Sequence, residues 1–404
     1  MWKSVRLGDV CEIQPKKAQI KERLSDADEV SFMPMDNLGI DKMYPTANQT
    51  KTMANVYGSY TYFEDNDVLL AKITPCFENG KLGIATSLKN GVGFGSSEYI
   101  VLRCGEEVLP QYIYYHLNQP NFRVEGKKYM SGAVGHKRVP KDFVENFELQ
   151  LPPLPDQQRI VAKLDAAFAE IDRAIDVAES KYTEVEKLKA ALLASALRSE
   201  DWKTVKLGEA CTFISRGISP KYTEDSGVLV LNQKCIRNHS IDYSLARRHD
   251  IGKKGVKPER FIQKGDVLIN STGQGTLGRV AQVREEPPEP TTVDSHVTIV
   301  RPNLEKFYLH YFGYALIQIE EELKQSGQGT SGQTELSKTR VQKEFFASYP
   351  SDKREQQLIV TKLDAAFAEI DKSAESISQA KANYLALKSA ILAQELQPPE
   401  SQAA

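Results

Sequence analysis

Apolar residues recur at alternating intervals of three and four in two long stretches of the chain. The first stripe comprises Leu164, Phe168, Ile171, Ile175, Ala178, Tyr182, Val185, Leu188 and Leu192, and the second Leu363, Phe367, Ile370, Ala374, Ile377, Ala380, Tyr384, Leu387 and Ile391. Neither glycine nor proline interrupts residues 156–198 or 352–396. This spacing is typical of a coiled-coil seam. It predicts two helices, each about 60 Å long at about 1.5 Å per residue.

The residues before each stretch predict where its helix starts. Pro152, Pro153 and Pro155 exclude a helix before Asp156, because proline lacks an amide hydrogen and restricts the residue that precedes it. Before the second stretch, Asp352 is followed three residues later by a glutamate, which is the pattern of a capping box.

The start of each stretch is one sequence written twice. The segment QQRIVAKLDAAFAEID at 157–172 recurs as QQLIVTKLDAAFAEID at 356–371, with fourteen of sixteen positions identical at an offset of 199 residues. The chain is therefore two copies of one plan. The repeat also includes WKSVRLGDVCEI at the N-terminus and WKTVKLGEACTFI from Trp202, where matching tryptophan, leucine, glycine and cysteine residues indicate packing positions.

Chain order predicts how the two helices pair. Each helix exposes an apolar stripe that needs a partner in water. The second globular segment begins a few residues after the first helix ends and leads into the second helix. If both connections are local, the helices run antiparallel, with the globular segments at opposite ends and related by a pseudo-twofold axis. The alternative is two amphipathic helices that lie on separate globular cores.

The globular segments combine short strands with a few helices. Strands are expected at DVLLAKI (67–73) and DVLINST (266–272), each followed by a glycine-containing turn and a second short run. Aromatic-rich helices are expected from Gln111 and from Lys306. The predicted class is α+β, with two mixed domains separated by a long antiparallel two-helix coiled coil. The expected boundaries are 1–151, 152–200, 201–350 and 351–404, of which the second and fourth are helical spacers.

The last loop of each globular segment has an unusual composition. MSGAVGHKRVPKDF from Met130 and SGQGTSGQTELSKTRV from Ser326 are rich in glycine, serine, threonine, glutamine and basic residues. Such loops let backbone approach a polar partner and offer many short hydrogen-bonding groups, although a plain surface loop has a similar composition. The helical repeats and the domain starts are preserved while these loops diverge. That contrast favours two recognition modules on a common frame.

Charge and cysteine content narrow the class of protein. The formal net charge is −2, but residues 201–350 carry 21 basic and 18 acidic side chains, a net charge of +3. Basic residues cluster at Arg123, Lys127, Lys128, Lys137, Arg138 and Lys141, and at Arg237, Arg247, Arg248, Lys253, Lys254, Lys257, Arg260 and Lys264. Such runs bind phosphates or form solvated loops. With five scattered cysteines, no apolar run of about 20 residues and no signal peptide at the N-terminus, a reduced cytoplasmic protein is expected.

No catalytic motif stands out. Gly273, Gly275 and Gly278 spell GxGxxG, but a strand-like run follows them instead of the helix that a dinucleotide site requires. The nucleotide-binding loop GxxxxGK[ST], the zinc motif HExxH and the nucleophile motif GxSxG are missing, as is an NPPY-like methyltransferase signature. His239 and His249 near Cys235 lack metal-ligand spacing. The chain is therefore not expected to be an enzyme, nor to bind a metal or cofactor itself.

The sequence resembles the specificity subunits of type I restriction and modification enzymes over nearly its whole length. The resemblance is carried by PPLPDQQRIVAKLDAAF, by REQQLIVTKLDAAF and by the glycine-rich loops before them. It implies two target recognition domains that each read half of a bipartite site in double-stranded DNA, with the helices fixing the gap. It also implies two modification subunits that bind S-adenosylmethionine and methylate adenine. Restriction subunits that use ATP and Mg²⁺ to translocate and cleave DNA are implied as well. The chain departs from the family pattern in three places. The segment YPSDKREQQ lacks the proline pair, and Asp156 stands where glutamate is more usual. The first domain also lacks the turn that the second domain has in RGISPKY.

Polar residues in the loops are the candidates for DNA contact. Lys and Arg would set the register on phosphates, whereas Asn, Gln, Ser and Arg would read base edges. The candidates are Lys72, Thr74, Ser96, His136, Lys137 and Arg138 in the first domain, and Arg216, Ser219, Lys221, Asn270, Ser271, Gln274, His296, Gln328 and Gln333 in the second. Three alternatives are a coiled-coil scaffold without a DNA-reading role, a stand-alone DNA-modifying enzyme, and an antagonist or truncated variant within the family.

Overall fold

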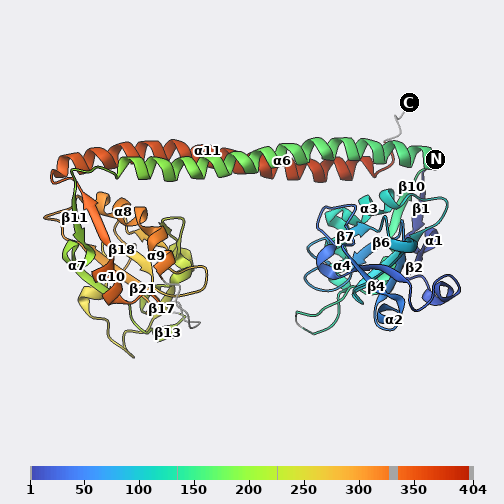
Figure 1. Ribbon diagram of the computed structural model, residues 1–404, viewed down its shortest axis with the longest axis horizontal. Coiled ribbons are helices and arrows are strands. Elements are labelled where there is room, and N and C mark those ends of the chain that lie inside the picture. Colours follow the sequence, from blue (N-terminus) through green and yellow to red (C-terminus); the bar gives the residue numbers. More distant parts are fainter. Residues whose placement is uncertain (1, 134, 225, 327–334, 400–404) are drawn as a thin grey trace. The chain divides into compact units, whose positions relative to one another are not determined.

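The computed structural model describes residues 2–399 apart from 134, 225 and 327–334. It divides into two compact units, Met1–Glu179 with Ser378–Ala404, and Ser180–Ile377. Each unit contains one globular domain and a part of both long helices, α6 (Leu154–Ala196) and α11 (Lys353–Glu395) (Figure 1). The two long helices predicted from the apolar stripes are confirmed.

The start of α6 differs slightly from the expectation, whereas α11 begins directly after the predicted cap residue Asp352. Helix α6 begins at Leu154, so the prediction that no helix precedes Asp156 is wrong by two residues. Pro155 occupies the first turn, where a missing amide hydrogen costs no helical hydrogen bond. At the start of α11, the Asp352 carboxylate accepts a hydrogen bond from the amide of Arg354 at 2.8 Å, which caps the helix.

The domain of the first unit contains two four-stranded sheets. Their orders are β2-β9-β6-β7 and β4-β3-β8-β5, and β1 pairs with β10 beside them. The strands are β1 (Lys3–Arg6), β2 (Cys11–Ile13), β3 (Glu29–Met33), β4 (Gln49–Thr52), β5 (Thr61–Glu64), β6 (Val68–Ala71), β7 (Leu82–Ile84), β8 (Val92–Gly95), β9 (Tyr99–Cys104) and β10 (Glu148–Leu151). The helices are α1 (Leu7–Val10), α2 (Met53–Val56), α3 (Pro110–Asn118), α4 (Pro120–Tyr129) and α5 (Lys141–Glu145).

The domain of the second unit repeats the first of these sheets, but the strand order of its second sheet differs. Its sheets have the orders β12-β21-β18-β19 and β13-β17-β14-β20, β11 pairs with β22, and a hairpin β15-β16 is added. The strands are β11 (Lys203–Lys206), β12 (Cys211–Arg216), β13 (Tyr222–Thr223), β14 (Val228–Leu231), β15 (Ile236–Arg237), β16 (Ser240–Ile241), β17 (Arg247–His249), β18 (Val267–Asn270), β19 (Val280–Gln282), β20 (Thr291–Val293), β21 (Val297–Pro302) and β22 (Phe346–Tyr349). The helices are α7 (Leu207–Ala210), α8 (Leu309–Gln318), α9 (Glu320–Ser326) and α10 (Lys338–Glu344).

The α+β class predicted from the sequence is confirmed. Most strand pairs are antiparallel, but β3 pairs with β8 and β14 with β20 in parallel. The strands expected at 67–73 and 266–272 are β6 and β18, and the aromatic-rich helices are α3 and α8. Leu7 and Leu207 at the two domain starts are fully buried, as the matching positions indicated.

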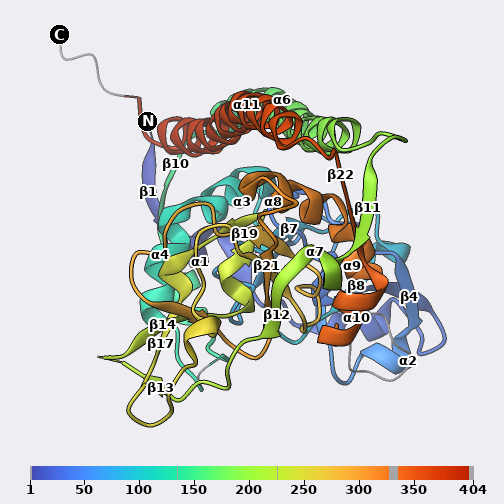
Figure 2. The ribbon, with the colours of Figure 1, turned by 90° about the vertical axis from the view of Figure 1, so that its left-hand side faces the viewer.

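Within each unit, α6 and α11 lie side by side and run antiparallel (Figure 1, Figure 2). In the first unit, three ion pairs join the two helices, and these are Lys163 with Glu395, Asp172 with Lys388, and Glu179 with Lys381. From one pair to the next, the residue number rises along α6 and falls along α11, so the helices run in opposite directions. In the second unit, Lys189 of α6 pairs with Asp371 of α11 at 2.6 Å. The antiparallel pairing predicted from chain order is therefore confirmed inside each unit.

The helices also pack on the globular domains. Ile160, Leu164 and Phe168 of α6 and Leu392 of α11 belong to the same buried cluster as Leu7 of the first domain. In the second unit, side chains of α6 and α11 join the core of the second domain in the same way. The two predicted arrangements, helix on helix and helix on core, thus coexist in each unit.

One glutamine fastens the start of α6 to the first domain. The side chain of Gln157 is fully buried. Its Oε1 accepts a hydrogen bond from the amide of Leu109 at 2.9 Å, and its Nε2 donates to the carbonyls of Glu107 at 2.9 Å and Pro152 at 2.8 Å. A side-chain amide that makes three buried hydrogen bonds fixes the angle at which the helix leaves the domain.

The second copy reproduces this attachment. Gln356 is also fully buried; its Oε1 accepts from the amide of Tyr308 at 2.6 Å, and its Nε2 donates to Lys306 at 3.0 Å and Pro350 at 2.8 Å. About two turns further on, a tyrosine hydroxyl of the domain donates to an aspartate of the helix, and its ring meets a helix phenylalanine edge to face at 5.6 Å between centroids. These trios are Tyr115, Asp165 and Phe168, and Tyr314, Asp364 and Phe367. The helical repeat is preserved at these positions because it holds the domains.

Candidate nucleic-acid interface

In the first domain, the loop before α6 folds back onto the end of strand β6. The amide of Thr74 donates to the carbonyl of Lys137 at 2.9 Å, and the amide of Val139 donates to that of Lys72 at 2.9 Å. Lys72 donates its own amide to the carbonyl of Glu98 at 2.9 Å. This ladder brings together all six first-domain candidates, Lys72, Thr74, Ser96, His136, Lys137 and Arg138.

A carboxylate lies at the centre of this cluster. Nε and Nη2 of Arg138 donate to the two carboxylate oxygens of Glu98 at 2.9 and 2.7 Å. The hydrogen bond from Arg138 is the main cause that lowers the pKa of Glu98, and the positive charges of Lys72 and His136 add to it. Ser96 accepts a hydrogen bond from the Glu98 amide at 3.2 Å. The cluster thus offers a fixed carboxylate surrounded by basic side chains.

The second domain builds the same backbone frame. The amide of Ser271 donates to the carbonyl of His296 at 2.8 Å, and the amide of Leu336 donates to that of Ser271 at 2.9 Å. An antiparallel bridge joins Thr272 to Glu335. The equivalent bridge in the first domain joins residues 73 and 138, so the two last loops are anchored in the same way.

The side chains on the two frames carry different charges. Arg138 of the first bridge corresponds to Glu335 of the second. Arg138 binds the carboxylate of Glu98, whereas Glu335 forms an ion pair with Nη1 of Arg216. Arg216 also donates from Nη2 to the carbonyl of residue 336 at 3.1 Å. Equivalent places therefore present an arginine in one domain and a glutamate in the other.

Three of the predicted residues hold buried polar atoms without partners. In the described part of the chain, five buried side-chain nitrogen or oxygen atoms make no hydrogen bond, and these include Oγ1 of Thr74, Nε of Arg216 and Oδ1 of Asn270. Buried polar groups in folded proteins are nearly always paired, and an exception calls for an explanation such as a water molecule, an ion or a functional role. Their occurrence at both loop anchors supports these loops as binding surfaces.

The other candidates beside the second anchor differ in exposure. Asn270 and Ser271 are fully buried; Nδ2 of Asn270 donates to the carbonyl of Gln233 at 3.0 Å, and the Ser271 hydroxyl bonds to that of Thr298 at 2.5 Å. Their side chains hold the frame from within. Gln274 and His296, by contrast, are exposed. The ring of His296 is oriented by a hydrogen bond of 2.7 Å between its Nδ1 and the hydroxyl of Thr272.

Two second-domain candidates hydrogen-bond to a different set of residues. The amide of Lys221 donates to Nδ1 of His249 at 2.8 Å, and Lys254 donates to the carbonyl of Ser219 at 3.0 Å. Ser219 and Lys221 are thus held beside the edge strand β13 and its neighbour β17. Gln328 and Gln333 lie outside the described residues. All fifteen candidates stay predictions as DNA contacts.

Sequence reasoning missed the acidic members of the clusters. Glu98 and Glu335 are not among the predicted residues, because basic and neutral polar side chains are the commoner DNA contacts. Carboxylates accept hydrogen bonds from the N4 amino group of cytosine, so acidic side chains also belong to base-reading surfaces. Their loop positions, beside a predicted strand and within the last loop, were visible in the sequence.

Other kinds of site find little support in the described residues. No group of three or more His, Cys, Asp and Glu side chains there has the arrangement of a metal site. None of the described helices combines the length and apolar character needed to cross a membrane.

Two similar α+β domains, each with one preserved frame and its own polar loop ends, define a modular recognition protein. The model of the type I restriction modification DNA specificity domain family matches residues 1–186 and 199–382. The chain belongs to this family, whose members are non-catalytic specificity subunits.

Two curated relatives from Escherichia coli match 237 residues, or 58% of this chain and 39% of each relative. The type I restriction enzyme EcoEI specificity subunit is 32% identical over the match, and the EcoAI specificity subunit is 30% identical. The matched part of the chain therefore corresponds to about two fifths of the length of these relatives.

Solved structures share the fold at lower sequence identity. One is a chain from a structural study of complex assembly and conformational transition in the type I R-M system. Its TM-score is 0.77 and its sequence identity is 20%, and the match covers 98% of this chain and 97% of that chain. The HsdS subunit from Thermoanaerobacter tengcongensis has a TM-score of 0.53 and 19% identity over 98% of this chain and 96% of that one.

Proposed function

We propose that this chain is the sequence-recognition subunit of a type I restriction-modification complex that reads a bipartite site in double-stranded DNA. Each domain reads one half, and the helices fix the gap between the halves. The division into domains at 1–151 and 201–350, with helical spacers at 152–200 and 351–404, belongs to this proposal. The proposal is supported by the loop anchor that both domains share, which presents Arg138 in the first domain and Glu335 in the second. One scaffold with differently charged side chains at the same place is suited to reading different bases.

The proposed partners are two modification subunits and, in the restricting complex, restriction subunits. Several residues of the helical repeat are exposed in both copies yet identical, among them Gln158 and Gln357, Ala166 and Ala365, and Glu170 and Glu369. Packing within each unit does not require this identity. Two copies of one exposed surface suit two copies of one partner.

The chemistry in this proposal belongs to those partners. Modification subunits would hold S-adenosylmethionine and methylate adenine, and restriction subunits would use ATP and Mg²⁺. This chain would supply base and phosphate contacts only, and it would act in the cytoplasm, where the DNA is.

The test is to co-express the chain with the neighbouring modification subunit and to map methylated adenine across a genome by single-molecule sequencing. One split motif with a fixed gap is the expected result. The chain alone, expressed as a control, should methylate nothing. If a complex forms but no bipartite motif emerges, the protein is a scaffold without a DNA-reading role.

A further inference from the structure

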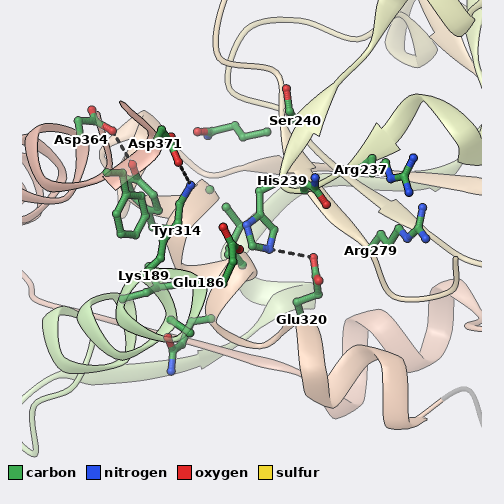
Figure 3. Close-up of a pocket in the computed structure, with 18 of the residues that line it drawn as sticks. Glu186, Lys189, Arg237, His239, Ser240, Arg279, Tyr314, Glu320, Asp364 and Asp371 are labelled. Carbon is green, nitrogen blue, oxygen red and sulfur yellow. Dashed lines mark hydrogen bonds and ion pairs between the residues drawn. The ribbon is translucent and has the colours of Figure 1, made fainter. Parts of the chain in front are cut away.

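The second unit contains a cavity of about 1100 Å³ between its helices and its globular domain. Helices α6 and α11 line one side, and the opposite side is formed by the β15-β16 hairpin and the turn before β19 (Figure 3). Charged side chains project into it from both sides.

Most of the basic side chains that line this cavity contact carboxylates. The pairs are Lys189 with Asp371 at 2.6 Å, Arg284 with Asp364 at 2.8 Å, His239 with Glu320 at 3.3 Å and Lys324 with Glu320 at 2.6 Å. His310 also lines the cavity, and burial is the main cause that lowers its pKa, so its ring is neutral near pH 7.

Two arginines at the hairpin side are the exception. Arg279 donates from Nη2 to the carbonyl of Gly275 at 2.9 Å and from Nη1 to that of Ile236 at 3.5 Å, which places its guanidinium beside the backbone next to Arg237. In the described chain, neither arginine forms an ion pair. Figure 3 shows both at the end of the cavity away from α6 and α11, whereas Glu186 lies on the side of α6. Two like charges thus lie together without a counter-charge.

The turn that Arg279 contacts is open to solvent at Gly275. Residues 273–278, the GxGxxG segment, form a turn between β18 and β19 and start no helix. Gly275 adopts a φ of +76°, and nothing lies within 4 Å of the place where a Cβ would stand. An exposed, side-chain-free backbone of this kind permits close approach of a ligand, and the candidate base reader Gln274 precedes it.

We infer that Arg237 and Arg279 bind one backbone phosphate of the DNA half-site that the second domain reads. The inference rests on the proposed function and adds a phosphate contact to it. A phosphate would supply the missing negative charge, and guanidinium groups bind phosphate oxygens with paired, charge-assisted hydrogen bonds. Because Arg279 also braces the turn at Gly275, the contact would set the position of Gln274 on the duplex.

The test uses the complex with the modification subunit and a duplex that carries the mapped site. Binding is measured by fluorescence anisotropy between 50 and 200 mM salt for the wild type, for Arg237→Gln and for Lys206→Gln. The last is a matched control, because it removes the same charge from the exposed strand β11. The slope of log K against log salt should fall in Arg237→Gln, by at most the value of about 0.9 for one whole phosphate contact because Arg279 remains, and stay unchanged in Lys206→Gln. The methylated motif should be the same in all three.

An unchanged slope in Arg237→Gln overturns the inference. A site for free phosphate is distinguished by thermal shift with inorganic phosphate: stabilisation that disappears in Arg237→Gln while the DNA slope stays the same also overturns it. If the wild-type complex fails to bind the duplex at all, the proposed function itself fails. Arg279→Gln is a second variant, expected to lower the slope similarly and to weaken the preference at the base that Gln274 contacts.

Discussion

Lys388 of α11 binds Asp172 of α6 at 2.8 Å, and its ammonium group lies 5.0 Å from the ring centroid of Phe168. The second unit repeats this contact with Lys189, Asp371 and Phe367, at 2.6 Å for the ion pair and 5.1 Å for the ring. Each long helix therefore supplies the lysine in one unit and the carboxylate and ring in the other. The seam of each unit uses the same contact.

Reversing the charge at this contact should weaken the first unit. Lys388→Glu replaces an attraction with a repulsion and removes the cation from the ring, for an expected loss of about 1 kcal/mol in the free energy of unfolding. Adding Asp172→Lys should restore part of the loss, which urea unfolding would measure. Lys372→Glu, in an exposed pair within one helix, is the control and should change little. A double variant as unstable as the single one would argue against the contact.

Truncating the buried glutamine should detach a helix start from its domain. Gln157→Ala leaves a buried amide and two carbonyls unpaired, for an expected cost of about 2 to 4 kcal/mol. Faster hydrogen exchange at the amide of Leu109 and a lower urea midpoint would confirm this. The neighbouring Gln158→Ala, at an exposed position, should fall within about 0.5 kcal/mol of the wild type. Equal effects of the two changes would contradict the proposed attachment.

Changing the central carboxylate of the first loop cluster should alter one half-site only. Glu98→Gln keeps the shape of the side chain but removes the negative charge that binds Arg138. It also replaces a group that only accepts hydrogen bonds with an amide that both donates and accepts them. We expect relaxed preference at one or two positions in the half that the first domain reads, seen in the methylation map. Glu335→Gln is the mirror experiment for the other half. A change in both halves from either variant would show that these residues act on the whole complex.

A buried histidine should make the first domain sensitive to acid. His116 is 5% exposed, its Nε2 has no partner, and burial lowers its pKa to about 3. In the unfolded chain His116 binds a proton as the pH falls through about 6.5, whereas in the folded chain it stays neutral there. The free energy of unfolding therefore falls as the pH drops below that value. The loss from this group should be about 2 kcal/mol between pH 7 and pH 5.

The measurement is urea unfolding at both pH values for the wild type and for His116→Phe, which keeps an aromatic ring against Tyr112. The variant should lose less stability on acidification than the wild type. Identical pH dependence in the two proteins would exclude His116 as the cause.

Shortening the helical pair should shorten the gap in the target. Removing seven residues from the middle of α6 and seven from the facing part of α11 preserves the seam and takes away about 10.5 Å at 1.5 Å per residue. At 3.4 Å per base pair, the gap should lose about three base pairs while both half-sites stay the same. The methylation map reads this directly. A variant that methylates with the original gap would show that the helices do not measure the distance.

Much of the frame could be predicted from the sequence. Periodicity located both long helices, since a stripe such as Leu164 to Leu192 requires one continuous partner surface. The strands at 67–73 and 266–272 were visible because they are short apolar runs with turn residues beside them. The exact start of α6 was missed because Pro155 is tolerated inside a first turn, which a simple breaker rule overlooks.

The loop clusters depended on contacts that no local pattern reveals. Glu98 and Arg138 are 40 residues apart, and only the folding of the last loop onto β6 brings them together. Asn270 and Ser271 are buried at the end of β18, where Thr272 bridges to Glu335 and the amide of Leu336 donates to the carbonyl of Ser271. Amino-acid composition was enough to predict the loops. Which of their side chains are exposed depends on hydrogen bonds to residues far away in the sequence, which the sequence does not reveal.

The identical attachment of both domains has a consequence for heredity. Gln157 and Gln356, with the tyrosines and aspartates beside them, form a joint that does not distinguish one domain from the other. Recombination between the two halves of a gene, or between related genes, would therefore join a different globular domain to the existing helices and keep the same attachment. A lineage could acquire a new target in a single crossover, with no need to evolve it base by base.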